Sequence, residues 1–492
     1  VQLDDSGHTF INGGLVTGGV QLGNGTNVGV LEAGSTLDGT LLGGSGNDTV
    51  VVKGDAQFTK IDGGATGDDL LQFDGAQYTY ADADAIHNFD KVQLTGNSTV
   101  TLERGLSVAK NGSDNAAVQI DAGSTLAVAT GQAFVLNNPL SGQGTVSTDT
   151  GGHAFSFGEA NVGQTASNFV GTLAVGNSRF DLSAQNTAAL TQATLRADKG
   201  SMTTVGDGDQ KIGGLAFNGG TVAFNASVPD QTMASSTINT ALLDVSGSGN
   251  VQVTVPMPYV PSAPGTPDTV NLLEQDDGYV GTKLVDAQQV RGSAGSLKLY
   301  DQDGNLISDK REVDVAQEGS VVAKATYDFG LTTSADGTTQ DGLYVNYGLK
   351  QLDLQADQTL TLEQTPGATG VAADLSAKLT GEGNLAIRAG NGVISVSNTE
   401  SDYTGQTQVQ TGTLKLGADQ ALGKTSLLVM EGGTGVDLDA FAQTVGQLDA
   451  KAGSVLDLNG GALTVKDGGT SAGSLRGEGT LRADAGELAI RG

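Results

Sequence analysis

Several residue types that anchor compact domains are scarce or missing from this chain of 492 residues. It has no cysteine and no tryptophan, and aromatic residues make up only 4%. Without cysteine the chain forms no disulfide, holds no thiolate-bound metal and has no cysteine nucleophile. Such a chain suits the cytosol, and it equally suits a protein that crosses an oxidising compartment unfolded, where a premature disulfide would block passage.

Basic residues and long apolar runs are also in short supply. The chain carries 25 lysines and arginines against 55 aspartates and glutamates, a formal net charge of -30. This balance argues against nucleic acid and against direct docking on anionic lipid, because both require a basic face. No apolar run is long enough for a transmembrane helix. The chain begins at Val1 with neither methionine nor a signal sequence, so we expect a mature or trimmed piece.

A short repeat dominates the chain. About every 20 residues, a β-type run is followed by a glycine with a small polar residue and then by another β-type run. Residues 122–128, 381–387, 452–458 and 477–483 are clear examples. One unit cannot bury its apolar face alone, so the units must stack, and stacked strands with tight turns form a parallel β-helix. The 75 glycines have no Gly-X-Y period, which excludes collagen.

Three regions follow from this repeat: N-terminal coils in residues 1–250, an irregular region in residues 251–348, and C-terminal coils in residues 349–492. Roughly 390 residues in coils of about 20, spaced by about 4.8 Å, predict about 19 coils and a rod about 90 Å long. A rod of this kind meets other molecules through its outer surface. We therefore expect a binding protein and not an enzyme.

The irregular region holds five of the eight prolines and six of the nine tyrosines. Prolines remove ladder donors, so the cluster Pro256, Pro258, Pro261, Pro264 and Pro267 predicts an extended loop. Two β-hairpins are expected, one around the turn 301–304 and one that pairs 321–327 with 342–347. We expect this all-β excursion to leave the rod, pack on its side and return.

The same region supplies the candidate ligand-binding residues. Tyrosine offers rigid amphipathic contact area, and several cations lie nearby. The predicted set is Tyr259, Tyr279, Lys298, Tyr300, Lys310 and Arg311. The alternative is that these tyrosines only cover the coil beneath the hairpin.

Calcium is the best metal hypothesis. Residues 43–50, Gly-Gly-Ser-Gly-Asn-Asp-Thr-Val, match one unit of the Gly-Gly-x-Gly-x-Asp calcium-binding repeat, and residues 63–71 form an imperfect second copy. Carboxylates and carbonyls in such turns are the hard oxygens that Ca²⁺ prefers. The candidate ligands are Asp48, Asp68 and Asp69, which the repeat places one coil apart. The alternative is a pair of Gly/Asp turns with no ion, and no other cofactor is predicted.

Residues near the C-terminus resemble a known family. The segment Ser401-Asp-Tyr-Thr-Gly-Gln-Thr-Gln-Val-Gln-Thr-Gly-Thr-Leu is similar to the N-x-Y-T-G-x-T-x-V-x-x-G-T-L pattern of bacterial autotransporter passengers, with Ser401 in place of Asn. Residues 348–354 and 367–381 resemble AIDA-type self-associating adhesins, the branch of EhaB, UpaB and UpaC.

This resemblance implies a right-handed, three-stranded parallel β-helix displayed on the surface of a Gram-negative cell. An outer-membrane β-barrel translocator would follow the passenger in the precursor. The implied partners are host matrix proteins of the fibronectin, laminin or collagen class, glycosaminoglycans, or an identical passenger on another cell. The implied functions are attachment, aggregation and biofilm growth.

Two kinds of enzyme are the alternatives. Some autotransporter passengers are serine proteases, but residues 43–47 and 469–473 only partly match the segments that surround a catalytic serine, and the histidines His8, His87 and His153 are scattered. Parallel β-helices also include polysaccharide lyases and glycosidases, which need a carboxylate pair or a Ca²⁺ cluster in a groove. The sequence contains many carboxylates but does not pair them.

Overall fold

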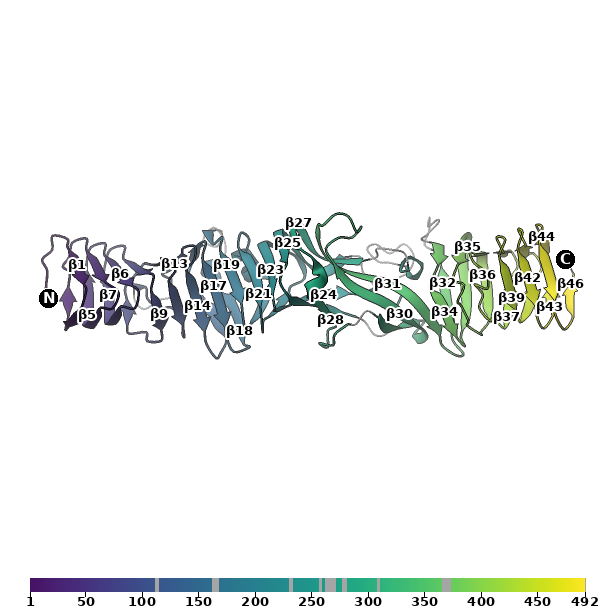
Figure 1. The fold of residues 1–492 in the computed structure, drawn as a ribbon, viewed down its shortest axis with the longest axis horizontal. Coiled ribbons are helices and arrows are strands. Elements are labelled where there is room, and N and C mark those ends of the chain that lie inside the picture. Colours follow the sequence, from purple (N-terminus) through teal and green to yellow (C-terminus); the bar gives the residue numbers. More distant parts are fainter. Residues whose placement is uncertain are drawn as a thin grey trace.

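The computed structural model shows one long rod with the two termini at opposite ends (Figure 1). It describes residues 1–110, 115–161, 168–229, 233–255, 259–261, 271–276, 281–307, 310–364 and 373–491. These residues form a nearly all-β solenoid of about 21 turns, which confirms the predicted fold class. The three strands per turn and the right-handed sense stay predictions. Four of the five clustered prolines, Pro256, Pro258, Pro264 and Pro267, lie outside the described residues.

Four mainly parallel sheets run along the N-terminal part of the rod. The first sheet contains β1 (Thr9–Asn12), β4 (Val28–Leu31), β6 (Thr49–Lys53), β8 (Leu70–Asp74), β11 (Lys91–Thr95), β13 (Ala117–Ile120) and β16 (Leu140–Gly142). The second contains β2 (Leu15–Thr17), β3 (Val20–Gln21), β5 (Thr36–Gly44), β7 (Gln57–Gly64) and β10 (Ile86–His87). The third begins with β9 (Gln77–Tyr80), β12 (Thr99–Leu102), β14 (Thr125–Ala129), β17 (Thr145–Asp149), β19 (Thr172–Val175), β21 (Thr194–Asp198), β23 (Gly208–Asn218), β25 (Met233–Val245) and β27 (Gly281–Gly292). The fourth contains β15 (Phe134–Leu136), β18 (Ala154–Phe157), β20 (Arg179–Leu182), β22 (Met202–Val205), β24 (Thr221–Ser227), β26 (Gly249–Thr254) and β28 (Leu297–Tyr300).

Two further parallel sheets build the C-terminal part of the rod. The fifth sheet contains β32 (Thr359–Glu363), β33 (Asp374–Leu375), β35 (Asn384–Val396), β36 (Thr407–Leu416), β37 (Leu427–Met430), β38 (Gly435–Asp437), β40 (Gln447–Ala450), β41 (Val455–Asp457), β43 (Gly469–Ser471), β44 (Ser474–Arg476) and β46 (Leu488–Ile490). The sixth contains β39 (Ala442–Val445), β42 (Ala462–Val465) and β45 (Thr480–Ala483). The described helices are α1 (Ala184–Ala189) and the short 3₁₀ turns η2 (Glu159–Asn161), η4 (Leu272–Glu274) and η5 (Ala294–Ser296), and none of them is long and apolar enough to cross a membrane.

Alternation of apolar and polar residues explains why successive turns stack. In β11 the side chains of Val92 and Leu94 are buried, while those of their strand neighbours face outward. Val92 pairs in register with Leu71 of the preceding turn and Val118 of the following one. Buried residues therefore lie above one another, and together they form one apolar core along the rod, from Val20 to Val465.

The turns before the central region form an N-terminal stack, and the turns after it form a C-terminal stack. The central region joins these two stacks through long antiparallel strands. It contains β29 (Lys310–Gln317), β30 (Ser320–Thr332) and β31 (Gly342–Leu354), which extend the third sheet. The first half of β31 pairs antiparallel with β27, and its last residues pair parallel with β34 (Lys378–Gly381). One strand of 13 residues thus hydrogen-bonds to both stacks.

The predicted excursion is therefore only partly correct. The strands β30 and β31 do form a hairpin, but residues 323–327 pair with 349–354 and not with 342–347 as predicted. The turn at 301–304 closes only a single bridge between Tyr300 and Leu306. The hairpin lies in line between the two stacks and not on the side of a continuous rod (Figure 1). The reason is that β31 replaces the next coil as the pairing partner of β27.

Candidate functional site

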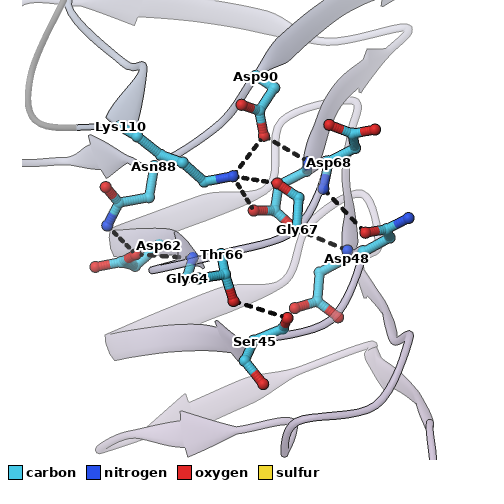
Figure 2. Close-up of polar contacts among 12 residues, drawn as sticks. Ser45, Asp48, Asp62, Gly64, Thr66, Gly67, Asp68, Asn88, Asp90 and Lys110 are labelled. Atoms are coloured by element: carbon cyan, nitrogen blue, oxygen red, sulfur yellow. Dashed lines mark hydrogen bonds and ion pairs between the residues drawn. The ribbon is translucent and has the colours of Figure 1, made fainter.

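The predicted calcium segment forms a ladder of carboxylate and amide side chains across successive turns (Figure 2). Asn27, Asp48, Asp69 and Asp90 each stand 21 residues after the preceding member. Asp48 accepts the backbone N–H of Asn27 at 2.8 Å, Asp69 that of Asp48 at 2.9 Å, and Asp90 that of Asp69 at 2.9 Å. The predicted stacking of Asp48 and Asp69 one coil apart is confirmed, and the ladder satisfies backbone donors that the turns would otherwise bury.

A lysine lies where the calcium hypothesis places a cation. The Nζ of Lys110 donates to Asp90 at 2.8 Å and to the carbonyl of Gly67, and it lies 3.4 Å from Asp69 (Figure 2). Asp48 and Asp69 are buried, but Asp68 is exposed and donates its backbone N–H to Asn47. The three predicted ligands do not converge, and no group of three or more His, Cys, Asp or Glu residues in the described chain is placed to hold a metal.

Burial dominates the electrostatics of this ladder. It raises the pKa of Asp69 to about 6, although the backbone N–H of Asp48 and the ammonium of Lys110 act in the opposite direction. Burial also raises the pKa of Asp48 above its usual value. The Oδ2 atom of Asp48 has no hydrogen-bond partner among the described residues. The arrangement holds turns together and leaves two buried carboxyls whose pKa values are raised.

One predicted binding residue, Tyr259, belongs to an interior cluster of tyrosines. Tyr259 and Tyr327 are fully buried, and both hydroxyls hydrogen-bond to the side chain of Gln275. Tyr327 also packs edge-on against Tyr347, with ring centroids 6.2 Å apart. Tyr259 therefore cannot contact a ligand at the surface, which corrects its assignment as a binding residue. The cause is that tyrosine fills the core of the central sheet while its hydroxyl finds a buried partner.

The other predicted binding residues separate into two groups, apart from Tyr279, which lies outside the described residues. Arg311 donates to buried Asp301 at 2.8 Å, and Asp301 accepts the backbone N–H of Asn305, so this arginine holds a turn. Lys310 is exposed on β29. Lys298 is exposed and Tyr300 is half-buried on β28, the last strand of the fourth sheet. The six residues do not form one site.

The autotransporter-like segment has a structural role. Tyr403 is fully buried, and its hydroxyl lies 2.5 Å from the Oγ1 of Thr407, which lies 2.9 Å from that of Thr425. Thr425 donates to the carbonyl of Gly405 at 2.8 Å. A Cβ on Gly405 would lie 2.0 Å from the carbonyl oxygen of Gly383, so only glycine fits. The Tyr-Thr-Gly-x-Thr part of the pattern thus ties successive turns together.

Two surface cavities were not predicted from the sequence. One of about 630 Å³ lies where the central sheet meets the C-terminal stack, and its lining includes Glu318, Asp357, Glu363 and Arg388. Arg388 there bonds the side chain of Gln410 at 2.7 Å and lies 3.6 Å from Glu363.

The second cavity, of about 700 Å³, runs along the fourth sheet. Its lining comes from strands far apart in sequence, with turns of unequal length between them. The pairing register of successive strands aligns these lining residues. Knowledge of that register would have been needed to predict the cavity.

Comparison with known proteins gives partial matches. No protein-family profile matches the chain. It is 42% identical over 374 residues to the uncharacterised lipoprotein YdeK of Escherichia coli K12, covering 73% of this chain and 28% of that protein. It is 42% identical over 358 residues to YuaQ, an uncharacterised protein of the same organism, covering 71% of this chain and 25% of that protein. The chain thus spans about a quarter of the length of these curated relatives.

A third relative is named as an adhesin. The chain is 36% identical over 154 residues to the adhesin BmaC autotransporter of Brucella suis biovar 1 strain 1330, covering 30% of this chain and 4% of that protein. This partial likeness and the β-solenoid together fit the passenger part of an autotransporter.

Proposed function

We propose that this chain is part of the surface-displayed passenger of an AIDA-type autotransporter adhesin and that it acts by binding, not by catalysis. The observation that carries the proposal is the 36% identity to an adhesin autotransporter in a chain that folds as a β-solenoid. The names of the relatives, a lipoprotein and an autotransporter adhesin, support a location at the cell envelope or surface. A long rod (Figure 1) presents its outer faces to partners.

The partners we propose are host matrix proteins of the fibronectin, laminin or collagen class, glycosaminoglycans, or an identical passenger on another cell. Two copies of a chain with a net charge of -30 repel each other at long range, and salt screens this repulsion. We therefore expect aggregation of cells that display the chain to rise with ionic strength or with Ca²⁺.

The experiment is a binding screen with the whole chain displayed on cells. Sedimentation of the cells measures self-association, and adhesion to wells coated with matrix proteins or glycosaminoglycans measures attachment. Cells that display an unrelated β-solenoid of similar charge are the control. Adhesion or sedimentation above this control supports the proposal, and its absence in every arm contradicts it.

A second candidate function is degradation of a polysaccharide. The cavity between the central sheet and the C-terminal stack carries the carboxylates of Glu318, Asp357 and Glu363, and glycosidases need such groups in a groove. Incubation of the purified chain with uronate polymers distinguishes the two functions. New unsaturated or reducing ends would favour the enzyme, whereas unchanged polymer retained on the protein favours the adhesin.

A further inference from the structure

The outer face of the fourth sheet aligns residues from five turns. Strand register places one outward-facing position of each strand in a single row: Arg179, Met202, Thr221, Asn250 and Lys298. A parallel row two residues further on contains Asp181, Thr204, Ala223, Gln252 and Tyr300. With about 4.8 Å between neighbouring strands, the backbones of Arg179 and Lys298 stand about 19 Å apart along the rod.

Part of these two rows forms the floor of a groove. The cavity of about 700 Å³ is lined by Arg179, Met202, Thr221 and Asn250 of the first row, by Thr204 and Gln252 of the second row, and by Gln302 beyond them. One wall contains Gly152, Gly200 and Gly219, whose φ angles of 84°, 87° and 92° are left-handed. Because glycine has no side chain, this wall stays open, and the groove is accessible along several turns.

Arg179 is the one charged residue in the described lining of this groove. Arg179 and Lys298 are exposed, and neither forms an ion pair with any residue that the structure describes. No carboxylate belongs to the described lining, although Asp181 lies in the second row and Asp303 follows Gln302. The chain has a net charge of -30, but Arg179 lies in the lining of the groove and Lys298 lies further along the same row. These two cations without ion-pair partners among the described residues favour an anionic ligand. At 0.15 M salt the Debye length is about 8 Å, so charges close to the groove, and not the net charge of the whole chain, set the electrostatic potential there.

The other side chains narrow the class of ligand. Between the cations, Thr204, Thr221, Asn250 and Gln252 present hydroxyl and amide groups that both donate and accept hydrogen bonds. Asn250 already donates to Thr221 at 3.2 Å, so this part of the floor is ordered. From β18 to β26 every strand is paired on both sides, so an extended peptide cannot add as another strand. The lining has neither the aromatic platforms nor the many cations that single-stranded nucleic acid requires.

We propose that this groove binds a linear glycan that carries acidic groups, with Arg179 and Lys298 pairing the acids and the row between them bonding the sugar hydroxyls. This inference rests on the proposed binding function and assigns it to one face. The shared chemistry is an anionic polysaccharide. Its acid is either a carboxylate or a sulfate, and the experiment separates the two.

The test measures binding of the purified whole chain to three polymers at 0.15 M salt. Hyaluronan carries only carboxylates, heparin also carries sulfates, and dextran is neutral. We expect binding to hyaluronan, to heparin or to both, none to dextran, and a decrease with added salt. Arg179→Ala and Asn250→Asp should each weaken binding by about tenfold or more, because each removes or opposes a charge-assisted contact.

Lys211→Ala is the matched control. Lys211 is an exposed cation on β23, which follows β22 in the chain but belongs to the third sheet. It has no ion pair among the described residues. This variant removes the same charge and should change binding by less than about twofold, as expected for a distant site. Circular dichroism and thermal unfolding show whether each variant is folded.

Each result has a defined meaning. Selective weakening by the two groove variants supports the inference. Equal weakening by all three variants shows that charge acts non-specifically and overturns it, as does equal binding to dextran. If neither acidic polymer binds but matrix proteins or identical cells still do, the groove assignment fails while the adhesin proposal stands.

Discussion

The two stacks solve the same packing problem with different chemistry. Each turn buries backbone groups that need hydrogen-bond partners, and both stacks supply them from side chains. The N-terminal stack uses the carboxylate ladder of Asp48, Asp69 and Asp90. The C-terminal stack uses the hydroxyl of Thr425, which donates to the carbonyl of Gly405 and is linked through Thr407 to Tyr403. The turns around 27–90 are therefore held by ionisable groups, and the turns around 403–425 are held by neutral groups.

This difference separates geometry from electrostatics. The stacked-glycine geometry is shared, because a Cβ on Gly64 would lie 1.9 Å from the carbonyl oxygen of Gly44 and one on Gly405 would lie 2.0 Å from that of Gly383. Only the N-terminal ladder recruits a lysine, Lys110. Changes in geometry should thus disturb both stacks alike, whereas changes in charge should disturb one.

Alanine at the stacked glycines should have the largest effect. We expect Gly64→Ala and Gly405→Ala each to destabilise their own stack by about 3 kcal/mol, because the new methyl group overlaps the neighbouring backbone. Solenoids unfold locally, so hydrogen exchange followed by mass spectrometry should report the loss in the turns around each substitution.

Gly152→Ala measures the cost in stability of backbone strain without a steric overlap. Gly152 has a φ of 84°, but a Cβ there meets nothing within 4 Å. Strain alone should cost about 1 to 2 kcal/mol. A cost at Gly152 as large as that at Gly64, whose φ of 120° is also left-handed, would show that turn strain, and not stacking, makes glycine necessary at Gly64.

Removal of one ladder member should have the next largest effect. Asp48→Ala leaves the backbone N–H of Asn27 without its acceptor and should cost about 1 to 3 kcal/mol. Asp48→Asn keeps an acceptor oxygen and removes a buried charge, so the protection of the turn should stay close to that of the unmodified chain or increase.

Thr407→Val is the counterpart in the C-terminal stack. It keeps the shape but leaves the hydroxyl of buried Tyr403 without Thr407, and it should cost about 1 to 3 kcal/mol. Hydrogen exchange in the turns around 403–425 measures it. If Asp48→Asn were as costly as Asp48→Ala, the charge itself would stabilise the ladder and the comparison between the stacks would be wrong.

The repeat made the stacked turns predictable from the sequence. The path of the central strands that join the two stacks was not predictable. Alternation in short runs such as 452–458 predicts strands, and the regular spacing predicts stacking, because each unit needs a neighbour to bury its apolar face. The path of β31 depends on which distant strand it meets after β30, and pairs such as Gln351 with Lys378 have no local signal. Topology of that kind is decided by competition between long-range partners.

The candidate sites also divide into features that the repeat predicts and features that depend on long-range pairing. The stacking of Asp48 and Asp69 followed from the coil length. The reach of Lys110 into the ladder did not, because spacing places Lys110 one coil after Asp90 but does not tell which way its side chain points. Tyr259 resembled a binding residue because composition does not distinguish the inside of a sheet from its outside. The alignment of Arg179 with Lys298 depends on strand register through turns of unequal length.

A change in pH should give the smallest and most selective effect. The folded pKa of Asp69 is about 6, against an ordinary value of 3.8, so the folded state binds more protons than the unfolded state between about pH 4 and 6. The contribution of Asp69 to stability is therefore full below about pH 4, decreases as the pH rises to about 6, and is constant above that. The raised pKa of Asp48 adds to this trend in the same direction.

The C-terminal stack should not respond in this range. Burial raises the pKa of Tyr403 to about 12, so its network stays neutral from pH 4 to 8. Hydrogen exchange across this range, corrected for the intrinsic effect of pH on exchange, should show declining protection in the turns around 48–90 and constant protection around 403–425. Asp69→Asn should remove most of the slope in the N-terminal turns, since it leaves only Asp48 to titrate there. A slope of equal size in both stacks, or one that survives Asp69→Asn unchanged, would show that net charge and not the buried ladder controls the response.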